Sequence, residues 1–131
     1  MWSKTSRDVV RVSFEEYVKA WRERDKETEE RRERLRQSAK SDAARLAEYL
    51  SHQPAVTRVY LFGSALDADR FKEESDIDLA VEGLVPELFF KAWAALEELT
   101  HFRVDLVPLE DCSKAMRENI LGKGELLYEH G

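Results

Sequence analysis

The stretch TRVYLFGSALDADRFKEESDIDLAVE, residues 57–82, decides the fold of this 131-residue chain. Its first six residues are mostly β-branched or aromatic and end at Gly63, a pattern typical of a buried strand followed by a turn. A polar loop comes next, and residues 77–82 then alternate apolar and polar side chains as a half-buried strand does. The segment therefore predicts two strands joined by a polar loop.

The rest of the chain is predicted outward from these strands by periodicity and by glycine and proline boundaries. We expect a long helix from residue 14 to about 50, either unbroken or broken near 38–41, a helix over 86–99, a strand over 102–107, a helix over 113–121 and a strand over 125–128. Residues 7–12 are expected to form a short strand or an extended arm. The fold class is α+β, a small mixed sheet with helices packed on it, with residues 1–42 as an arm and long charged helix and residues 43–131 as the domain.

The long helix is unusual because every residue from Arg22 to Arg34 except Thr28 is charged. A heptad pattern fails there, which excludes a regular coiled coil. Two interpretations stay open: a solvated helix held at its ends, or a docking arm through which a homo-oligomer or hetero-oligomer forms.

Charge, hydropathy and cysteine content exclude several classes of protein. The net charge of −6 argues against stable nucleic-acid binding, which favours a basic surface. No apolar run is long enough to span a bilayer, so no membrane segment is expected. The single cysteine, Cys112, has no partner for an intramolecular disulfide, which indicates a cytoplasmic protein.

Three aspartates stand out because of where the expected strands place them. Asp76 and Asp78 flank one apolar residue, so strand alternation sends both carboxylates to one face. Asp105 sits within an otherwise apolar strand, where a lone carboxylate is costly unless it is paired or bound to a metal. If the second and third strands are neighbours, all three acids converge, and a divalent cation would neutralise them. Oxygen ligands favour Mg²⁺, and two such ions commonly clamp a phosphoryl transfer.

The Gly63-Ser64 pair at the end of the first strand suits a phosphate. Glycine lets the backbone approach a ligand closely, and the Ser64 hydroxyl and the backbone amides can donate to phosphate oxygens. A P-loop is excluded because its glycine and lysine pattern is missing. We expect an open cleft between this pair and the three aspartates.

Together, LFGS (residues 61–64), SDIDL (75–79) and VDLV (104–107) resemble the minimal nucleotidyltransferase (MNT) family of the polymerase-β-like superfamily. The resemblance covers about residues 43–131. It implies that Asp76 and Asp78 bind metal with Asp105 as the third acid, and that Gly63 and Ser64 hold the triphosphate of ATP. Asp105 would be either the general base or the metal ligand that helps deprotonate the attacking hydroxyl.

Family members of this size with an N-terminal extension are commonly MntA-like antitoxins of HEPN/MNT toxin–antitoxin pairs. The resemblance thus implies a Mg²⁺-dependent enzyme that transfers AMP from ATP to a tyrosine hydroxyl of a HEPN ribonuclease toxin.

The chain departs from the family pattern in two ways, and these keep other functions open. The spacer from Ala65 to Ser75 has 11 residues, one more than usual, and acids replace the basic residue that often follows the Gly-Ser pair. The cations that neutralise triphosphate must come from Arg70, Lys72, Arg103 or elsewhere. One alternative is a weak or inactive module that neutralises its partner by binding. Another is nucleotidyl transfer to a small molecule.

Overall fold

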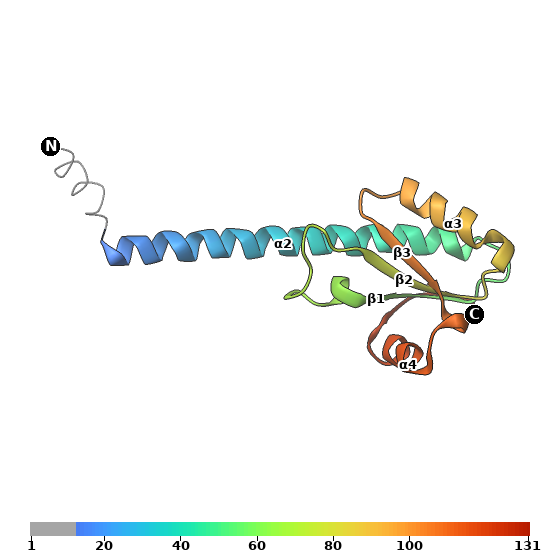
Figure 1. Ribbon diagram of the computed structural model, residues 1–131. Coiled ribbons are helices and arrows are strands. Elements are labelled where there is room, and N and C mark those ends of the chain that lie inside the picture. The colour runs from blue at the N-terminus through green and yellow to red at the C-terminus, as the bar shows by residue number, and fades with distance from the viewer. Residues whose placement is uncertain (1–12) are drawn as a thin grey trace. The chain divides into compact units, whose positions relative to one another are not determined.

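The computed structural model describes residues 13–131 and confirms the expected α+β fold with a mixed sheet (Figure 1). The strand or arm predicted for residues 7–12 lies outside the described part. The elements are, in chain order, α2 (Phe14–Ser51), β1 (Arg58–Phe62), the 3₁₀ turn η1 (Gly63–Leu66), β2 (Ile77–Glu82), α3 (Pro86–Glu98), β3 (Val104–Pro108), the 3₁₀ turn η2 (Leu109–Asp111), α4 (Lys114–Lys123) and β4 (Glu125–Glu129).

Within the described residues, four strands form one sheet in the order β3-β2-β1-β4. Strand β1 is antiparallel to both β2 and β4, whereas β2 and β3 are parallel and connected through α3. The parallel pair requires a crossover, and the helix that begins at Pro86 supplies it. As a result, the end of β1 and the starts of β2 and β3 lie at the same end of the sheet.

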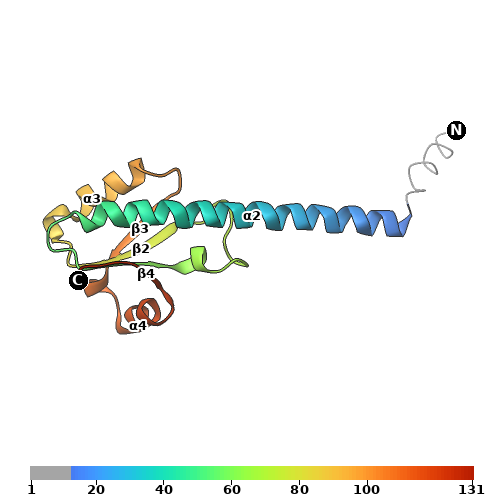
Figure 2. The ribbon, with the colours of Figure 1, turned by 180° about the vertical axis from the view of Figure 1, so that it is seen from behind.

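The two faces of the sheet are covered differently. Helices α2 and α3 lie on one face, and α4 lies on the other (Figures 1 and 2). The larger core lies on the first face, where alternate residues of β1, β2 and β3 pack against the apolar sides of α2 and α3. A smaller cluster lies on the α4 face and consists of Tyr60, Ala80, Leu109 and Ile120. Alternation in β2 and β3 therefore places Asp78 and Asp105 on the α4 face.

Helix α2 is a single helix, so the break considered near residues 38–41 does not form. Ala39 and Ala43 lie within that stretch or next to it, and both are buried in the larger core, which explains why the helix continues. At its start, Ser13 Oγ accepts a hydrogen bond from the Glu16 backbone N–H, at 3.1 Å. By compactness the chain divides into two units, Met1–Arg31 and Arg32–Gly131. The division at residues 42 and 43 stays a prediction.

The described part of the first unit exposes aromatic side chains on successive turns of its helix. Phe14, Tyr17 and Trp21 are all exposed, and Trp21 Nε1 donates a hydrogen bond to the Tyr17 hydroxyl at 3.2 Å. Among residues 13–131, the helices are too short or too polar to cross a lipid bilayer.

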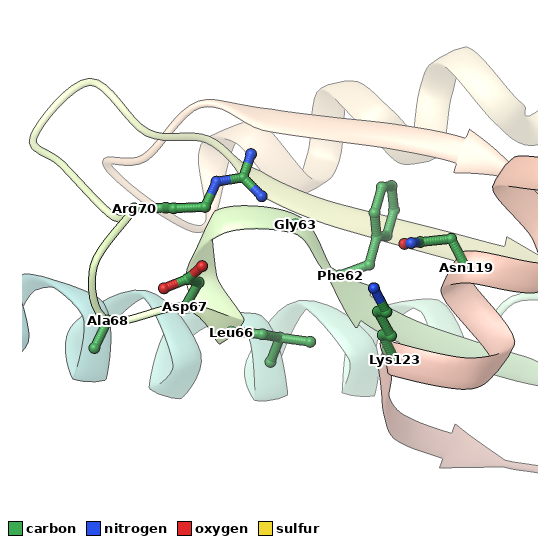
Figure 3. A pocket seen from close by; sticks show the side chains of 9 residues that line it. Phe62, Gly63, Leu66, Asp67, Ala68, Arg70, Asn119 and Lys123 are labelled. Carbon is green, nitrogen blue, oxygen red and sulfur yellow. The ribbon is translucent and has the colours of Figure 1, made fainter.

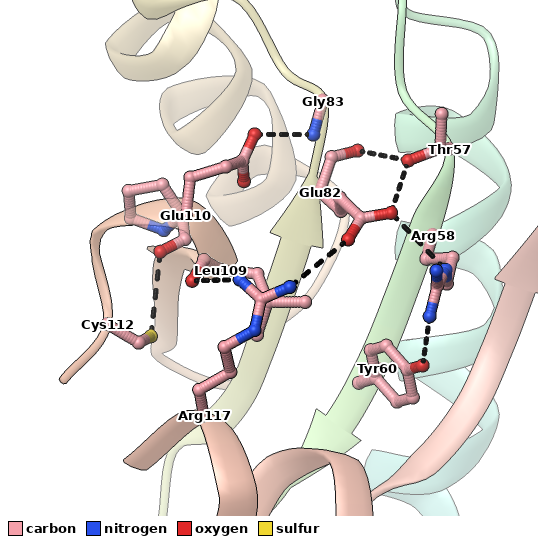
Figure 4. Close-up of polar contacts among 10 residues, drawn as sticks. Thr57, Arg58, Tyr60, Glu82, Gly83, Leu109, Glu110, Cys112 and Arg117 are labelled. Atoms are coloured by element: carbon pink, nitrogen blue, oxygen red, sulfur yellow. Dashed lines mark hydrogen bonds and ion pairs between the residues drawn. The ribbon is translucent and has the colours of Figure 1, made fainter. Parts of the chain in front are cut away.

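A polar network fixes α4 to the sheet at the end of β2 that is opposite Asp78 (Figure 4). The Glu82 carboxylate accepts a hydrogen bond from the Thr57 hydroxyl at 2.7 Å and lies 3.2 Å from Arg58 Nε. It also lies 3.9 Å from an Arg117 guanidinium nitrogen of α4. These contacts and the apolar cluster hold α4 in place, so its last turn stands beside η1.

Candidate functional site

Strand register brings the predicted carboxylates together. Phe62, the last residue of β1, pairs with Asp78, and Asp78 in turn pairs with Asp105 on the parallel neighbour. Paired residues on adjacent strands are about 4.8 Å apart and point to the same face. Asp78 and Asp105 are therefore neighbours beside the turn that Gly63 begins.

Gly63 is required at this turn for two independent reasons. Its φ of +80° lies in the left-handed region, which side chains rarely adopt. In addition, a Cβ atom placed on Gly63 would overlap the Oδ2 atom of Asp78. The glycine thus lets the backbone of the turn approach the Asp78 carboxylate closely.

The surroundings of Asp78 disfavour its charged form. Partial burial, and after it the negative charges of Asp105 and Asp76, together raise the pKa of this carboxyl from 3.8 to about 6. Asp76 immediately precedes β2, and its carboxylate lies 3.9 Å from Nε of Arg103. Of these three acids, Asp76 is therefore the one whose negative charge is partly balanced by a nearby arginine.

The acids fit a hard divalent cation by their chemistry. In residues 13–131, no three His, Cys, Asp or Glu side chains are gathered as a ready-made metal site. Mg²⁺, however, usually keeps several waters and takes only one or two carboxylates together with substrate phosphates. The neighbouring carboxylates of Asp78 and Asp105 match that requirement, and a cation would relieve the repulsion that raises the pKa of Asp78.

The turn after Gly63 is held by helix α2. The Arg36 guanidinium donates to the Ala65 carbonyl at 3.1 Å and binds Glu33 through two hydrogen bonds of 2.8 and 2.9 Å. Ser64 lies within this turn, and its carbonyl accepts a hydrogen bond from the Asp67 backbone N–H at 2.9 Å. Gly63 and Ser64 are therefore presented by a braced segment.

A pocket of about 420 Å³ lies beside Gly63 on the α4 side (Figure 3). It is formed by the end of β1, the turn and loop that follow, and the last turn of α4. The residues that line it are Phe62, Gly63, Leu66, Asp67, Ala68, Arg70, Asn119, Lys123 and Gly124. None of the three aspartates lines this pocket, but Phe62 and Gly63, which do line it, also lie beside Asp78.

The pocket contains two polar residues that the sequence did not single out. Asn119 and Lys123 lie one turn apart on α4 and point toward the pocket in Figure 3. A lysine in a short charged helix carries no local signal of function, and only the packing of α4 on the sheet brings it to Gly63. Of the three cations that the sequence offers for the triphosphate, Arg70 lines the pocket and Arg103 contacts Asp76, whereas Lys72 does not line the pocket.

Comparison with known proteins agrees with this geometry. Residues 44–131 match the family model described as polymerase beta, nucleotidyltransferase. Comparison with curated protein sequences gives no match.

Several solved structures are similar in fold. One, a toxin–antitoxin structure with AMP-PNP, aligns with a TM-score of 0.56 and 24% identity over 68% of this chain and 73% of that chain. Another contains a tri-AMPylated Shewanella oneidensis HEPN toxin in complex with an MNT antitoxin, at TM-score 0.51 and 23% identity over 72% and 73% of the two chains. A third, assigned as a minimal nucleotidyltransferase, aligns at TM-score 0.51 and 27% identity over 70% and 91%.

Proposed function

Because the chain belongs to the nucleotidyltransferase family of polymerase β, we propose that it is the antitoxin of a HEPN/MNT pair. In this proposal it transfers AMP from ATP to a hydroxyl group of the toxin, a tyrosine hydroxyl by family resemblance. The observation that carries the proposal is the pairing of Asp78 with Asp105 directly beside Gly63. The toxin–antitoxin structures with an ATP analogue and with an AMPylated toxin support the choice of substrate and partner.

The proposed reaction assigns a role to each of the three aspartates. The acceptor oxygen forms a bond to the α-phosphorus of ATP, the bond from that phosphorus to the diphosphate breaks, and pyrophosphate leaves. Asp105 accepts the hydroxyl proton, since it lies on edge strand β3, where an acceptor can approach. Asp76 and Asp78 would hold Mg²⁺ with Asp105, and the ion supplies charge stabilisation for the phosphoryl group.

Gly63 and Ser64 would bind the phosphates of the nucleotide. The glycine keeps the space beside Asp78 free of a side chain, so a phosphate can lie against the backbone. In the described part of the chain, the Ser64 hydroxyl has no hydrogen-bond partner, so it is available to donate to a phosphate oxygen. The brace from Arg36 fixes this turn before substrate binds, which reduces the ordering cost of binding.

A second function, neutralisation of the partner by binding alone, is favoured by one observation. The Asp67 carboxylate lines the pocket next to Gly63, where it opposes an anionic ligand. In this reading the fold serves as a scaffold, and the exposed aromatic residues of α2 are candidates for the contact surface.

Label transfer distinguishes the two functions. The full chain is incubated with α-labelled ATP, Mg²⁺ and the protein that copurifies with it, and Asp76→Ala/Asp78→Ala is compared with Asp69→Ala. Asp69 is an exposed carboxylate in the adjacent loop, so its variant controls for loss of charge. We expect label on the partner with the wild type and Asp69→Ala, and none with the double variant. A stable complex that is never labelled would refute the enzyme and leave the binding module.

A further inference from the structure

The pocket beside Gly63 carries positive charge from two separate elements. Arg70 comes from the loop after η1, and Lys123 comes from the last turn of α4, on the other side of the pocket in Figure 3. Within residues 13–131, neither side chain forms an ion pair. Two unpaired cations that face one hollow indicate an anionic ligand.

Asp67 lines the same pocket and has the opposite charge. Its Oδ1 atom accepts a hydrogen bond from the Asp69 backbone N–H at 2.9 Å, which fixes the carboxylate in place. With two cations and one carboxylate, the pocket keeps one excess positive charge. The affinity for an anion should therefore respond to Lys123 and to Asp67 with opposite signs.

The pocket also has the position and size for part of a nucleotide. Gly63 separates it from Asp78, so a chain of phosphates whose first member lies at the carboxylates would enter the pocket next. Its volume of about 420 Å³ is within the range of small-molecule sites. Asn119, one helical turn before Lys123, adds an amide that can donate to a phosphate oxygen.

We propose that this pocket binds the diphosphate end of ATP, with Lys123 and Arg70 as its cationic ligands, and that Asp67 weakens this binding. The proposal rests on the proposed function and adds residues to it. Lys123 adds positive charge from α4, because the loop after Ser64, which supplies Arg70, has more acidic than basic residues. Diphosphate binding at this point would also stabilise the pyrophosphate that leaves.

Calorimetric titration of the full chain with AMP-PNP and with AMP, both with Mg²⁺, tests the assignment. Lys123→Met should weaken AMP-PNP binding about three- to tenfold, as expected for loss of a partly solvated charge-assisted contact. Asp67→Asn should tighten it about two- to fivefold, because the amide keeps the acceptor oxygen but not the charge. Both variants should bind AMP as the wild type does, since AMP lacks the diphosphate.

Lys114→Met is the matched control, because Lys114 is an exposed lysine of the same helix that does not line the pocket. Lys123→Arg keeps the positive charge and should retain AMP-PNP affinity. A loss of affinity in Lys123→Met alone is then due to the missing charge and not to a change in folding. Unchanged AMP-PNP affinity in Lys123→Met would overturn the inference and leave the proposed function intact. Equal effects on AMP and AMP-PNP would also overturn it, since the pocket would then hold the nucleoside. A wild-type chain that does not bind AMP-PNP would refute both.

Discussion

Replacement of Asp78 by asparagine should make the folded chain more stable at neutral pH and at the same time inactive. The side chain is half-buried beside two further carboxylates, and its pKa is raised from 3.8 to about 6. At pH 7.5 the folded chain must therefore hold a charge that its surroundings disfavour. Asparagine has nearly the same shape and removes that charge.

The size and the pH dependence of the effect follow from linkage. A carboxyl whose pKa is higher in the folded chain stabilises the fold below pH 3.8, and this contribution is lost as the pH rises through about 6. The corresponding free energy, at about 1.4 kcal/mol per pKa unit, is about 3 kcal/mol. Because Asp78 is partly exposed, solvent screening reduces this to about 1–2 kcal/mol.

Thermal unfolding with a chelator present measures the prediction. At pH 7.5, Asp78→Asn should melt about 3–8 °C above the wild type, and the difference should shrink as the pH falls from 7 toward 4.5. Asp69→Asn, which removes an exposed charge of the same kind, should melt within about 2 °C of the wild type. Added Mg²⁺ should stabilise the wild type and Asp69→Asn but not Asp78→Asn. A less stable Asp78→Asn, or a difference that does not vary with pH, would refute the reasoning.

Three further substitutions test the turn and the core. Gly63→Ala should destabilise the chain by about 2–3 kcal/mol, because the alanine would have a positive φ and its Cβ would overlap a carboxylate oxygen. Gly122→Ala, at a helical glycine with open space around it, should stabilise the chain by up to about 1 kcal/mol. The melting temperatures of the two variants should therefore shift in opposite directions. Arg36→Met removes the hydrogen bond to a carbonyl of η1 and should cost about 1–2 kcal/mol in urea unfolding; an unchanged midpoint would show that the brace is not needed. Trp93→Phe loses the 2.7 Å hydrogen bond from Nε1 to a β3 carbonyl and should cost about 1 kcal/mol, whereas Trp21→Phe on the exposed helix should change the denaturation midpoint little.

The secondary structure could be predicted because its signals are local. The alternation in residues 77–82 predicts β2 as it is observed, and the proline at residue 86 marks the start of α3. The third strand is observed two residues later than expected, since Phe102 precedes the ladder and its ring packs against Phe71. Such boundaries depend on tertiary contacts, which a short window of sequence does not contain.

The loop after η1 shows the same limit. Its composition predicts a polar loop, yet Phe71 within it is fully buried in the larger core. A single aromatic residue among charged neighbours has no periodicity that would mark it as buried. The loop is anchored by this residue.

The candidate site was predictable only where strand alternation determines it. Asp76 and Asp78 could be placed on one face from their spacing, but the pairing of Asp78 with Asp105 depends on the parallel register of two strands separated by a helix. Lys123 and Arg36 were missed because each lies on a helix whose charges look alike in sequence. Their contacts with the turn depend on how the helices pack on the sheet.

The pairing of Phe62 with Asp78 determines how the site responds to a change in the length of the loop between them. The chain leaves the sheet at Phe62 and returns at its partner, so the ladder sets the distance from Gly63 to Asp78, whatever the number of residues between. One added residue in such a loop costs less than about 0.1 kcal/mol in closure entropy. The 11-residue spacer can therefore lengthen without moving the site, whereas a slip of the register by one residue would turn Asp78 into the core.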